Sequence, residues 1–456
     1  MKNIKVTKSP FLIFLPFLLF YTILVLFLYD KTIWGDEIRD LSYAQNLLHG
    51  FYSTPPPKIS LDIGPGYPLL MLVFLLLHLP LMCISLMNAV LNYLAIVFLF
   101  KTLQQITSFK IALIVSLFFG CYFNSLEFIA LMYSESLTLF LIALLGFLIV
   151  KAFDADKLKT SYWYIAGITM GYLALTKVIF GYVVLCMLII CLLLWLINRR
   201  TINYRKSVFI LLVALATTMP YLVYTYSLTG KVFYWGTTGG NNLYWMSTPY
   251  ENEYGNWIPD QVSDPKSAEQ DAVYAPQKGG VINLKNRDNS TPDSDDSLYA
   301  HHREDYVEID KYVGIERDEA YKKILFKNIK SHPVKYIENC ISNVGRILFN
   351  YPYSYTYQKP ATLFRLPFNG IIVVLALFCI IPTLINWRKL QFSVRFLLFF
   401  VALYLGSSIL GSAETRMFTV IVPLLLFWIT YICQRAIKIK LKFTKDINDD
   451  ISKVSG

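Results

Sequence analysis

The chain has 456 residues, of which 55% are hydrophobic and 16% are charged, and its formal net charge is +11. Soluble domains carry about 25% charged residues, and so few charges could not cover the surface of a water-soluble protein of this length. The composition therefore indicates an integral membrane protein and excludes disordered, fibrous, collagenous and disulfide-rich secreted classes.

The first apolar run, Phe11 to Tyr29, predicts an uncleaved membrane helix. It follows three lysines and lacks the small-residue cleavage site of a signal peptide. A membrane-spanning helix needs about 20 mostly apolar residues to cross about 30 Å of hydrocarbon. By this measure the sequence predicts nine further crossings, at approximately 81–100, 109–126, 133–150, 162–176, 178–197, 207–228, 367–386, 392–411 and 417–434.

The apolar run from Tyr67 to Leu79 is too short for a crossing. As a helix it would extend only about 20 Å, and Pro80 ends it. Ten crossings also place half of the 42 Lys and Arg residues on the cytoplasmic side. An eleventh crossing here would send most of them outward, against the positive-inside rule. We therefore expect a re-entrant or interfacial segment at the outer face, with both termini cytoplasmic.

The predicted fold class is an all-α polytopic membrane protein with about 10–11 transmembrane helices and a mixed extracytoplasmic region. Within that region, the stretch from Asp260 to Asp296 is rich in polar residues, Pro and Gly and is predicted to be irregular. Helices are expected after it, at 316–329 and 334–349. The predicted organisation is an N-terminal transmembrane module (1–228) with a first extracytoplasmic loop (30–66), an extracytoplasmic region (229–365), C-terminal transmembrane helices (366–434) and a cytoplasmic tail (435–456).

The first extracytoplasmic loop begins with an acidic pair, Asp36 and Glu37, next to Trp34 at the expected membrane edge. Spacings of three and four residues predict an amphipathic helix lying on the membrane surface. Its apolar stripe contains Ile38, Leu41, Gln45 and Leu48, and its polar stripe contains Asp36, Arg39, Asp40 and Tyr43. A carboxylate at a helix start is stabilised by the helix dipole, so on the spacing alone helix capping and solvation are favoured over catalysis.

Other charged residues are predicted at the same outer face. Glu414 and Arg416 lie in the last outer turn, where they could mark a turn in the headgroup layer or bind a phosphate through the guanidinium. Lys177 lies between the fifth and sixth crossings, where snorkelling is favoured over phosphate binding. Glu135 begins the fourth crossing and is a functional candidate because an ionisable group there is costly, with Glu127 a weaker one.

These charges share one interfacial layer, whereas a transporter keeps its key polar groups near the membrane midplane. The sequence also contains a His301–His302 pair, for which a structural role is favoured over metal binding, and an Asn289 glycosylation acceptor pattern. It has no P-loop, no Gly-x-Gly-x-x-Gly and no Gly-x-Ser-x-Gly motif. Nucleotide binding and serine hydrolase chemistry therefore have no support, and the positive charge is no sign of a nucleic-acid partner.

Several motifs together resemble the GT-C membrane glycosyltransferases, in particular the protein O-mannosyltransferase and lipid A aminoarabinose transferase superfamily (glycosyltransferase family 39). They are the Asp36-Glu37 pair, Gly64-Pro65-Gly66-Tyr67-Pro68-Leu69-Leu70, Ser134-Glu135-Ser136-Leu137, Leu175-Thr176-Lys177, Thr229-Gly230-Lys231-Val232, Gly239-Gly240-Asn241-Asn242-Leu243-Tyr244, Ser331-His332-Pro333-Val334-Lys335-Tyr336 and Glu414-Thr415-Arg416-Met417-Phe418. Their order and topological placement span about residues 35–430. The chain departs from the aminoarabinose branch at Ile63-Gly64-Pro65, where that branch has a Lys-Pro pair.

The resemblance implies an inverting enzyme of a bacterial inner or plasma membrane. It would move a sugar from a polyprenyl-phosphate donor to a lipid, glycan or protein acceptor outside the cytoplasm. By the same resemblance Asp36 is the general base and Glu37 shapes the site, Arg416 and Lys177 bind the donor phosphate, and Glu135, Glu414 and Tyr67 bind substrate. No metal ligand is assigned, and a divalent metal requirement stays open because related oligosaccharyltransferases need one. The alternatives are a lipid-linked sugar flippase or transporter, and a polysaccharide ligase or polymerase.

Overall fold

The computed structural model describes residues 9–33, 35–154, 161–199, 201–258, 296–355 and 361–436, and every regular element in these ranges is helical. The predicted all-α class is thereby confirmed. Trp34, the 260–295 stretch with its Asn289 acceptor pattern, and most of the C-terminal tail lie outside the described residues. The helices are α1 (Pro10–Ile13), α2 (Leu15–Leu28), α3 (Asp36–Leu48), α4 (Gly66–Leu76), α5 (Met82–Leu103), α6 (Phe109–Gly120), α7 (Phe123–Leu126), α8 (Glu135–Asp154), α9 (Ser161–Thr176), α10 (Ile179–Ile197), α11 (Ile202–Thr229), α12 (Gly239–Met246), α15 (Asp296–Ile309), α16 (Gly314–Ser331), α17 (Pro333–Phe349), α18 (Ala361–Ile385), α19 (Phe392–Leu410), α20 (Thr415–Thr419) and α21 (Val422–Ala436).

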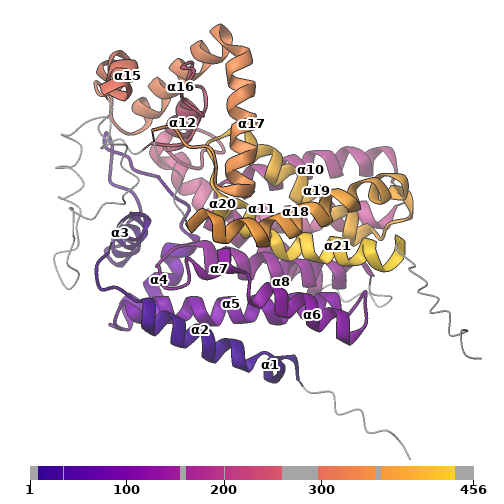
Figure 1. Ribbon diagram of the computed structural model, residues 1–456. Coiled ribbons are helices and arrows are strands. Elements are labelled where there is room, and N and C mark those ends of the chain that lie inside the picture. Colours follow the sequence, from indigo (N-terminus) through magenta and orange to yellow (C-terminus); the bar gives the residue numbers. More distant parts are fainter. Residues whose placement is uncertain are drawn as a thin grey trace, which may run out of the picture.

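Six helices in the described part of the chain are long and apolar enough to cross a membrane, namely α5, α8, α10, α11, α18 and α19. Most of the long helices run in one common direction (Figure 1). The other predicted crossings correspond to the shorter helices α2, α6, α9 and α21. At about 16 Å, α4 is too short to cross, as expected for an interfacial or re-entrant segment.

Two of the predicted crossings are broken rather than continuous. The 109–126 run divides into α6 and α7, and the carbonyl oxygen of Gly120 at the break accepts a hydrogen bond from the Tyr21 hydroxyl at 2.7 Å. The 417–434 run divides into α20 and α21, with Pro423 at the second residue of α21. Proline has no N–H to donate to the preceding turn. The α20 turn is therefore a separate element that can be oriented independently of α21.

Close helix packing at the centre of the bundle depends on small residues. Helix α9 packs between α8 and α11. A Cβ at Gly167 would lie 2.7 Å from the carbonyl oxygen of Ile210, and one at Gly171 would lie 2.5 Å from that of Ala214. The Gly-x-x-x-Gly spacing thus lets two backbones meet, as is common between membrane helices.

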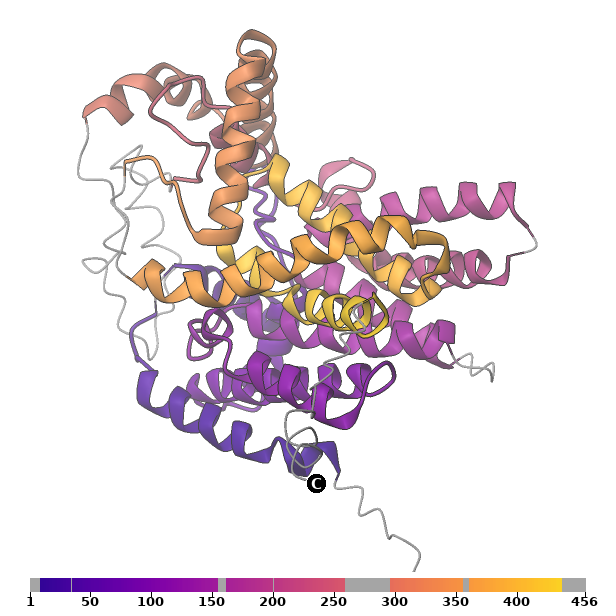
Figure 2. The same ribbon diagram turned by 45° about the vertical axis from the view of Figure 1, so that its right-hand side comes forward.

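The helices within the first and the longest predicted loops gather at one end of the bundle. Helices α3, α12, α15 and α16 lie to the left in Figure 1, where α3 is seen nearly end-on. Helix α17 runs nearly perpendicular to the long helices, and Figure 2 shows the same relation after rotation. The helices expected at 316–329 and 334–349 are confirmed as α16 and α17. The loops and helix starts that carry the predicted charges meet beneath these elements.

Candidate active site

Asp36 and Arg416, 380 residues apart in sequence, form an ion pair. The Asp36 Oδ2 and Arg416 Nη1 atoms are 2.5 Å apart, and a quarter of each side chain is exposed. The second oxygen of Asp36 lies 3.2 Å from Nη1 of Arg39, one turn along α3. Burial alone would raise the pKa of Asp36, but the charges of Arg39 and Arg416 hold it well below its usual range. In this state Asp36 is an ionised and weakly basic carboxylate.

Gly35 determines where Asp36 is placed. Its φ of +58° lies in the left-handed region that favours glycine, and it immediately precedes the first residue of α3. The chain leaving α2 therefore turns sharply and begins α3 at the acidic pair. The positive end of the helix dipole then also favours the ionised carboxylates.

Glu135 joins Lys177 and Arg416. It begins α8, and its Oε1 atom lies 2.9 Å from Nζ of Lys177 and 3.6 Å from Nη1 of Arg416. Arg416 also lies 3.1 Å, through Nε, from Oε2 of Glu414. The snorkelling interpretation of Lys177 was wrong, because its ammonium group is held by a buried carboxylate rather than directed to bulk water. The weaker candidate Glu127 pairs instead with Arg365.

The start of α4 packs directly on the turn that carries Lys177. A Cβ at either Gly64 or Gly66 would collide with the backbone of Leu175 and Thr176. Close packing therefore requires glycine at these two positions. Tyr67 follows them, fully buried and with its hydroxyl beside Asn88.

Both stripes of α3 are partly buried, which the amphipathic pattern did not predict. Asp40 of the polar stripe and Leu41 of the apolar stripe are buried, whereas Leu48 is exposed. Glu37, which lies between the stripes, is also buried and accepts a hydrogen bond from the backbone N–H of Met132 at 2.8 Å. This contact ties α3 to the segment before α8, and the shaping role that the resemblance implies for Glu37 stays a prediction.

Arg39 and Asp40 are parts of the cluster to which sequence reasoning gave no role. Asp40 lies 3.3 Å from Arg39 and has almost no exposed side-chain surface. Burial raises the pKa of Asp40 to about 7 against the opposing charge of Arg39. The three- and four-residue spacing from Asp36 was the available signal, since it places all three side chains on one face of the helix.

The turn between α19 and α20, which contains Glu414 and leads directly to Arg416 in α20, is held by α17. Asn343 of α17 is fully buried. Its amide nitrogen donates to the carbonyl oxygens of Ser408, Ile409 and Gly411, and its oxygen accepts from the N–H of Ala413. Arg346 donates to the same Asn343 oxygen at 2.9 Å. No local sequence signal identifies this role, because it depends on partners some 65 residues away.

A second polar cluster, between the 244–258 segment and α15, is separate from the first. Glu253 is buried and accepts hydrogen bonds from Thr248 and Tyr355, and His302 Nε2 lies 2.9 Å from it. Burial alone would raise the pKa of Glu253, but the hydrogen bonds from His302 and Thr248 hold it at about 2. His301 stacks on Tyr250 and also contacts Glu253. The cluster joins the 244–258 segment to α15, as the structural interpretation of the histidine pair predicts.

Neither cluster has the donor set of a metal centre. Among the described residues no group of three or more His, Cys, Asp or Glu side chains is arranged to hold an ion. Both Asp36 oxygens face arginines. The described residues of the two clusters therefore do not fit a resident metal ion.

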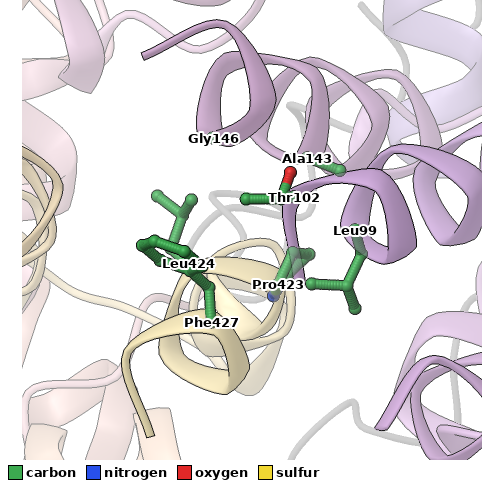
Figure 3. Close-up of a pocket in the computed structure, with 7 residues that line it drawn as sticks. All are labelled: Leu99, Thr102, Ala143, Gly146, Pro423, Leu424 and Phe427. Carbon is green, nitrogen blue, oxygen red and sulfur yellow. The ribbon is translucent and has the colours of Figure 1, made fainter. Parts of the chain in front are cut away.

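A small apolar hollow lies elsewhere in the bundle, between α5, α8 and α21 (Figure 3). It is lined by Leu99, Thr102, Ala143, Gly146, Pro423, Leu424 and Phe427. Ala143 and Gly146 are two to three turns along α8 from Glu135. With no ionisable side chain in its lining, this hollow offers no chemistry for the charged cluster.

Comparison with known proteins gives one family match. Residues 63–224, about a third of the chain, match the model of the dolichyl-phosphate-mannose-protein mannosyltransferases. No curated protein matches the chain significantly.

Two solved structures are similar in fold. One is ArnT from Cupriavidus metallidurans bound to undecaprenyl phosphate, with 12% identity over 92% of this chain and 77% of that one, and a TM-score of 0.40. The other is the Archaeoglobus fulgidus oligosaccharyltransferase, with 12% identity, a TM-score of 0.45 and coverage of 91% of this chain but only 50% of that one. The family match over residues 63–224 agrees with the resemblance to GT-C membrane glycosyltransferases that the sequence motifs indicate.

Proposed function

We propose that the protein is an inverting glycosyltransferase that uses a polyprenyl-phosphate-linked sugar and transfers it to an acceptor hydroxyl on the extracytoplasmic side of the membrane. The observation that carries the proposal is the Asp36–Arg416 ion pair, which joins an acid to a phosphate-binding type of side chain at one end of the helix bundle. A quarter of each side chain is exposed, so both can be reached by a ligand.

The cations are suited to the phosphate of a lipid-linked sugar. Arg416 and Lys177 come from separate turns and share the carboxylate of Glu135. A guanidinium can bind two phosphate oxygens at once. A lipid tail keeps the donor in the bilayer, so its phosphate reaches the protein at the ends of the membrane helices, where these side chains lie.

Donor binding would also activate the base. In the free protein Arg416 occupies Asp36 and depresses its basicity. A phosphate that takes over Arg416 would leave Asp36 with one arginine partner fewer, and its pKa would rise toward the ordinary range. The base would then become effective only when the donor is present, which protects the donor from premature attack by water.

The transfer step would proceed as follows. The acceptor hydroxyl gives its proton to Asp36 while its oxygen forms a bond to the anomeric carbon. The bond from that carbon to the phosphate oxygen breaks, and its electron pair stays on the phosphate, where Arg416 and Lys177 stabilise the added charge. Attack from the face opposite the phosphate inverts the anomeric centre.

The deciding experiment uses the full-length protein in lipid nanodiscs with synthetic undecaprenyl-phosphate sugars and measures release of undecaprenyl phosphate. Asp36→Asn should lower the rate by about 10²–10⁴, the usual contribution of a general base. Glu319→Gln is the matched control, because Glu319 forms an exposed ion pair with Lys231 at 2.6 Å. Full transfer by Asp36→Asn would refute the assignment. Movement of sugar lipid across liposomes without any covalent product would favour the flippase alternative.

A further inference from the structure

Helix α17 presents its polar residues to the protein and its apolar residues to the outside. Asn339, Asn343 and Arg346 are fully buried. On the other side, Val334 is 68%, Ile337 59% and Ile341 68% exposed. Each set repeats at three- and four-residue intervals, so the two sets form opposite stripes. A helix surrounded by water shows the reverse arrangement.

The buried polar face is compensated by hydrogen bonds to backbone carbonyl groups. Asn339 donates to the carbonyl oxygens of Met246 and Thr248 at 3.1 and 3.0 Å. Arg346 donates to that of Tyr254 at 2.5 Å, and Asn343 binds the turn that carries Arg416. The inward orientation of the helix is therefore fixed by the polar face.

The apolar face continues the apolar surface of the membrane helices. Tyr336 donates to the carbonyl oxygen of Leu410 at 2.8 Å, which places α17 at the end of α19. The adjoining helices also expose apolar side chains, with Leu410 53% exposed at the end of α19 and Phe364 69% exposed in α18. Helix α17 packs on both helices. It runs nearly perpendicular to the bundle, and therefore nearly parallel to a membrane that the bundle crosses (Figures 1 and 2).

We propose that the Val334–Ile337–Ile341 face of α17 lies in the outer membrane interface and that bilayer lipid is its occupant. An amphipathic helix lying in the interface buries its apolar side to the depth of the headgroup–acyl boundary. Glu338, exposed beside Ile337, suits this shallow position rather than the hydrocarbon centre. Because Asn343 on the opposite face holds the Arg416 turn, the same helix would fix the depth of that arginine relative to lipid headgroups.

The test places a photo-crosslinking amino acid at Ile337, and separately at Val334 and Ile341, in the full-length protein reconstituted in phosphatidylcholine liposomes. Mass spectrometry identifies what is attached after irradiation. Lys327 is the control, because it is an exposed residue of the preceding helix α16. Thermal unfolding of each labelled protein checks that the substitution leaves the fold intact.

Lipid adducts should form at the three α17 positions on the order of tenfold more often than at Lys327, as expected when one side faces acyl chains and the other faces water. Adducts to a second copy of the chain would instead make this face an interface between copies. Adducts within the same chain would show that another segment covers it. Either result, or equal lipid yields at Ile337 and Lys327, would overturn the proposal.

Discussion

Each of the two polar clusters contains a carboxylate with several partners, but the clusters differ in how much of their charge is open to a ligand. Around Asp36 the charges belong to ion pairs, and a quarter of the side-chain surface of both Asp36 and Arg416 is exposed to solvent. Around Glu253 the carboxylate has almost no exposed surface and is saturated by hydroxyl and imidazole groups. An exposed ion pair can exchange one partner for a phosphate at little cost, whereas a closed, saturated network loses hydrogen bonds when any member moves. The first cluster is therefore suited to binding and catalysis, and the second to holding the 244–258 segment against α15.

Removing Arg416 tests the open cluster most severely. Arg416→Ala should lower transfer by about 10²–10³, the effect of losing one electrostatic stabiliser of the transition state. Lys231→Ala is the matched control, since its exposed ion pair with Glu319 contributes at most about 1 kcal/mol. Turnover is measured over a range of donor concentrations. Equal rates for the two variants would remove Arg416 from the phosphate site.

Changing Glu253 tests the closed cluster. Glu253→Gln keeps the shape but replaces one acceptor oxygen by a donor group that faces Thr248, Tyr355 or His302. Leaving buried partners unsatisfied should lower the free energy of unfolding by about 1–3 kcal/mol. Thermal unfolding measures this loss, and transfer per folded molecule should change little. A large loss of transfer without loss of stability would contradict the structural role.

The exchange of partners on Arg416 makes a less intuitive prediction. Asp36→Asn should bind undecaprenyl phosphate more tightly, on the order of tenfold or about 1.4 kcal/mol, because the competing carboxylate charge is gone. Fluorescence or calorimetric titration in nanodiscs gives the Kd. Glu319→Gln should leave the Kd unchanged. Weaker binding of undecaprenyl phosphate by Asp36→Asn would refute the exchange of partners on Arg416. It would not refute the role of Asp36 as the base, which the activity assay tests separately.

Asp40 should make the stability of the folded protein depend on pH. Its folded-state pKa of about 7 lies above the unfolded value of about 3.9, so the folded protein binds the extra proton between these values. Stability should therefore fall as pH rises from about 4 to about 7 and then level off. Arg39, Asp36 and Glu135 are the charged groups that act on Asp40. The thermal midpoint of Asp40→Asn should lack this decline, and identical pH profiles for the two proteins would show that Asp40 stays ionised.

Much of the fold was predictable because the hydrophobic signal is local. Each predicted crossing contains a helix, since about 20 apolar residues in succession have no stable alternative inside a bilayer. The length of the apolar runs did not reveal the breaks near Gly120 and Pro423. The first depends on a hydroxyl from another helix, and the second on a proline whose effect the hydropathy of the run conceals.

The candidate site was only partly predictable. Sequence placed Asp36, Glu135, Lys177 and Arg416 in the same layer, because each one is next to the end of an apolar run. The burial of Asp40 was not foreseen, since a buried acidic side chain looks the same in sequence as a solvated one. Which carboxylate each cation meets was also not foreseen.

The sequence by itself determined that this is a helical membrane protein with its candidate site residues at the helix ends, because burying a charge in hydrocarbon is costly. Only the tertiary structure decided that Asp36 meets Arg416 and that Lys177 meets Glu135. It also decided that Asn343 holds the turn between α19 and α20. Those contacts depend on helix packing across hundreds of residues, which no local pattern of residues encodes.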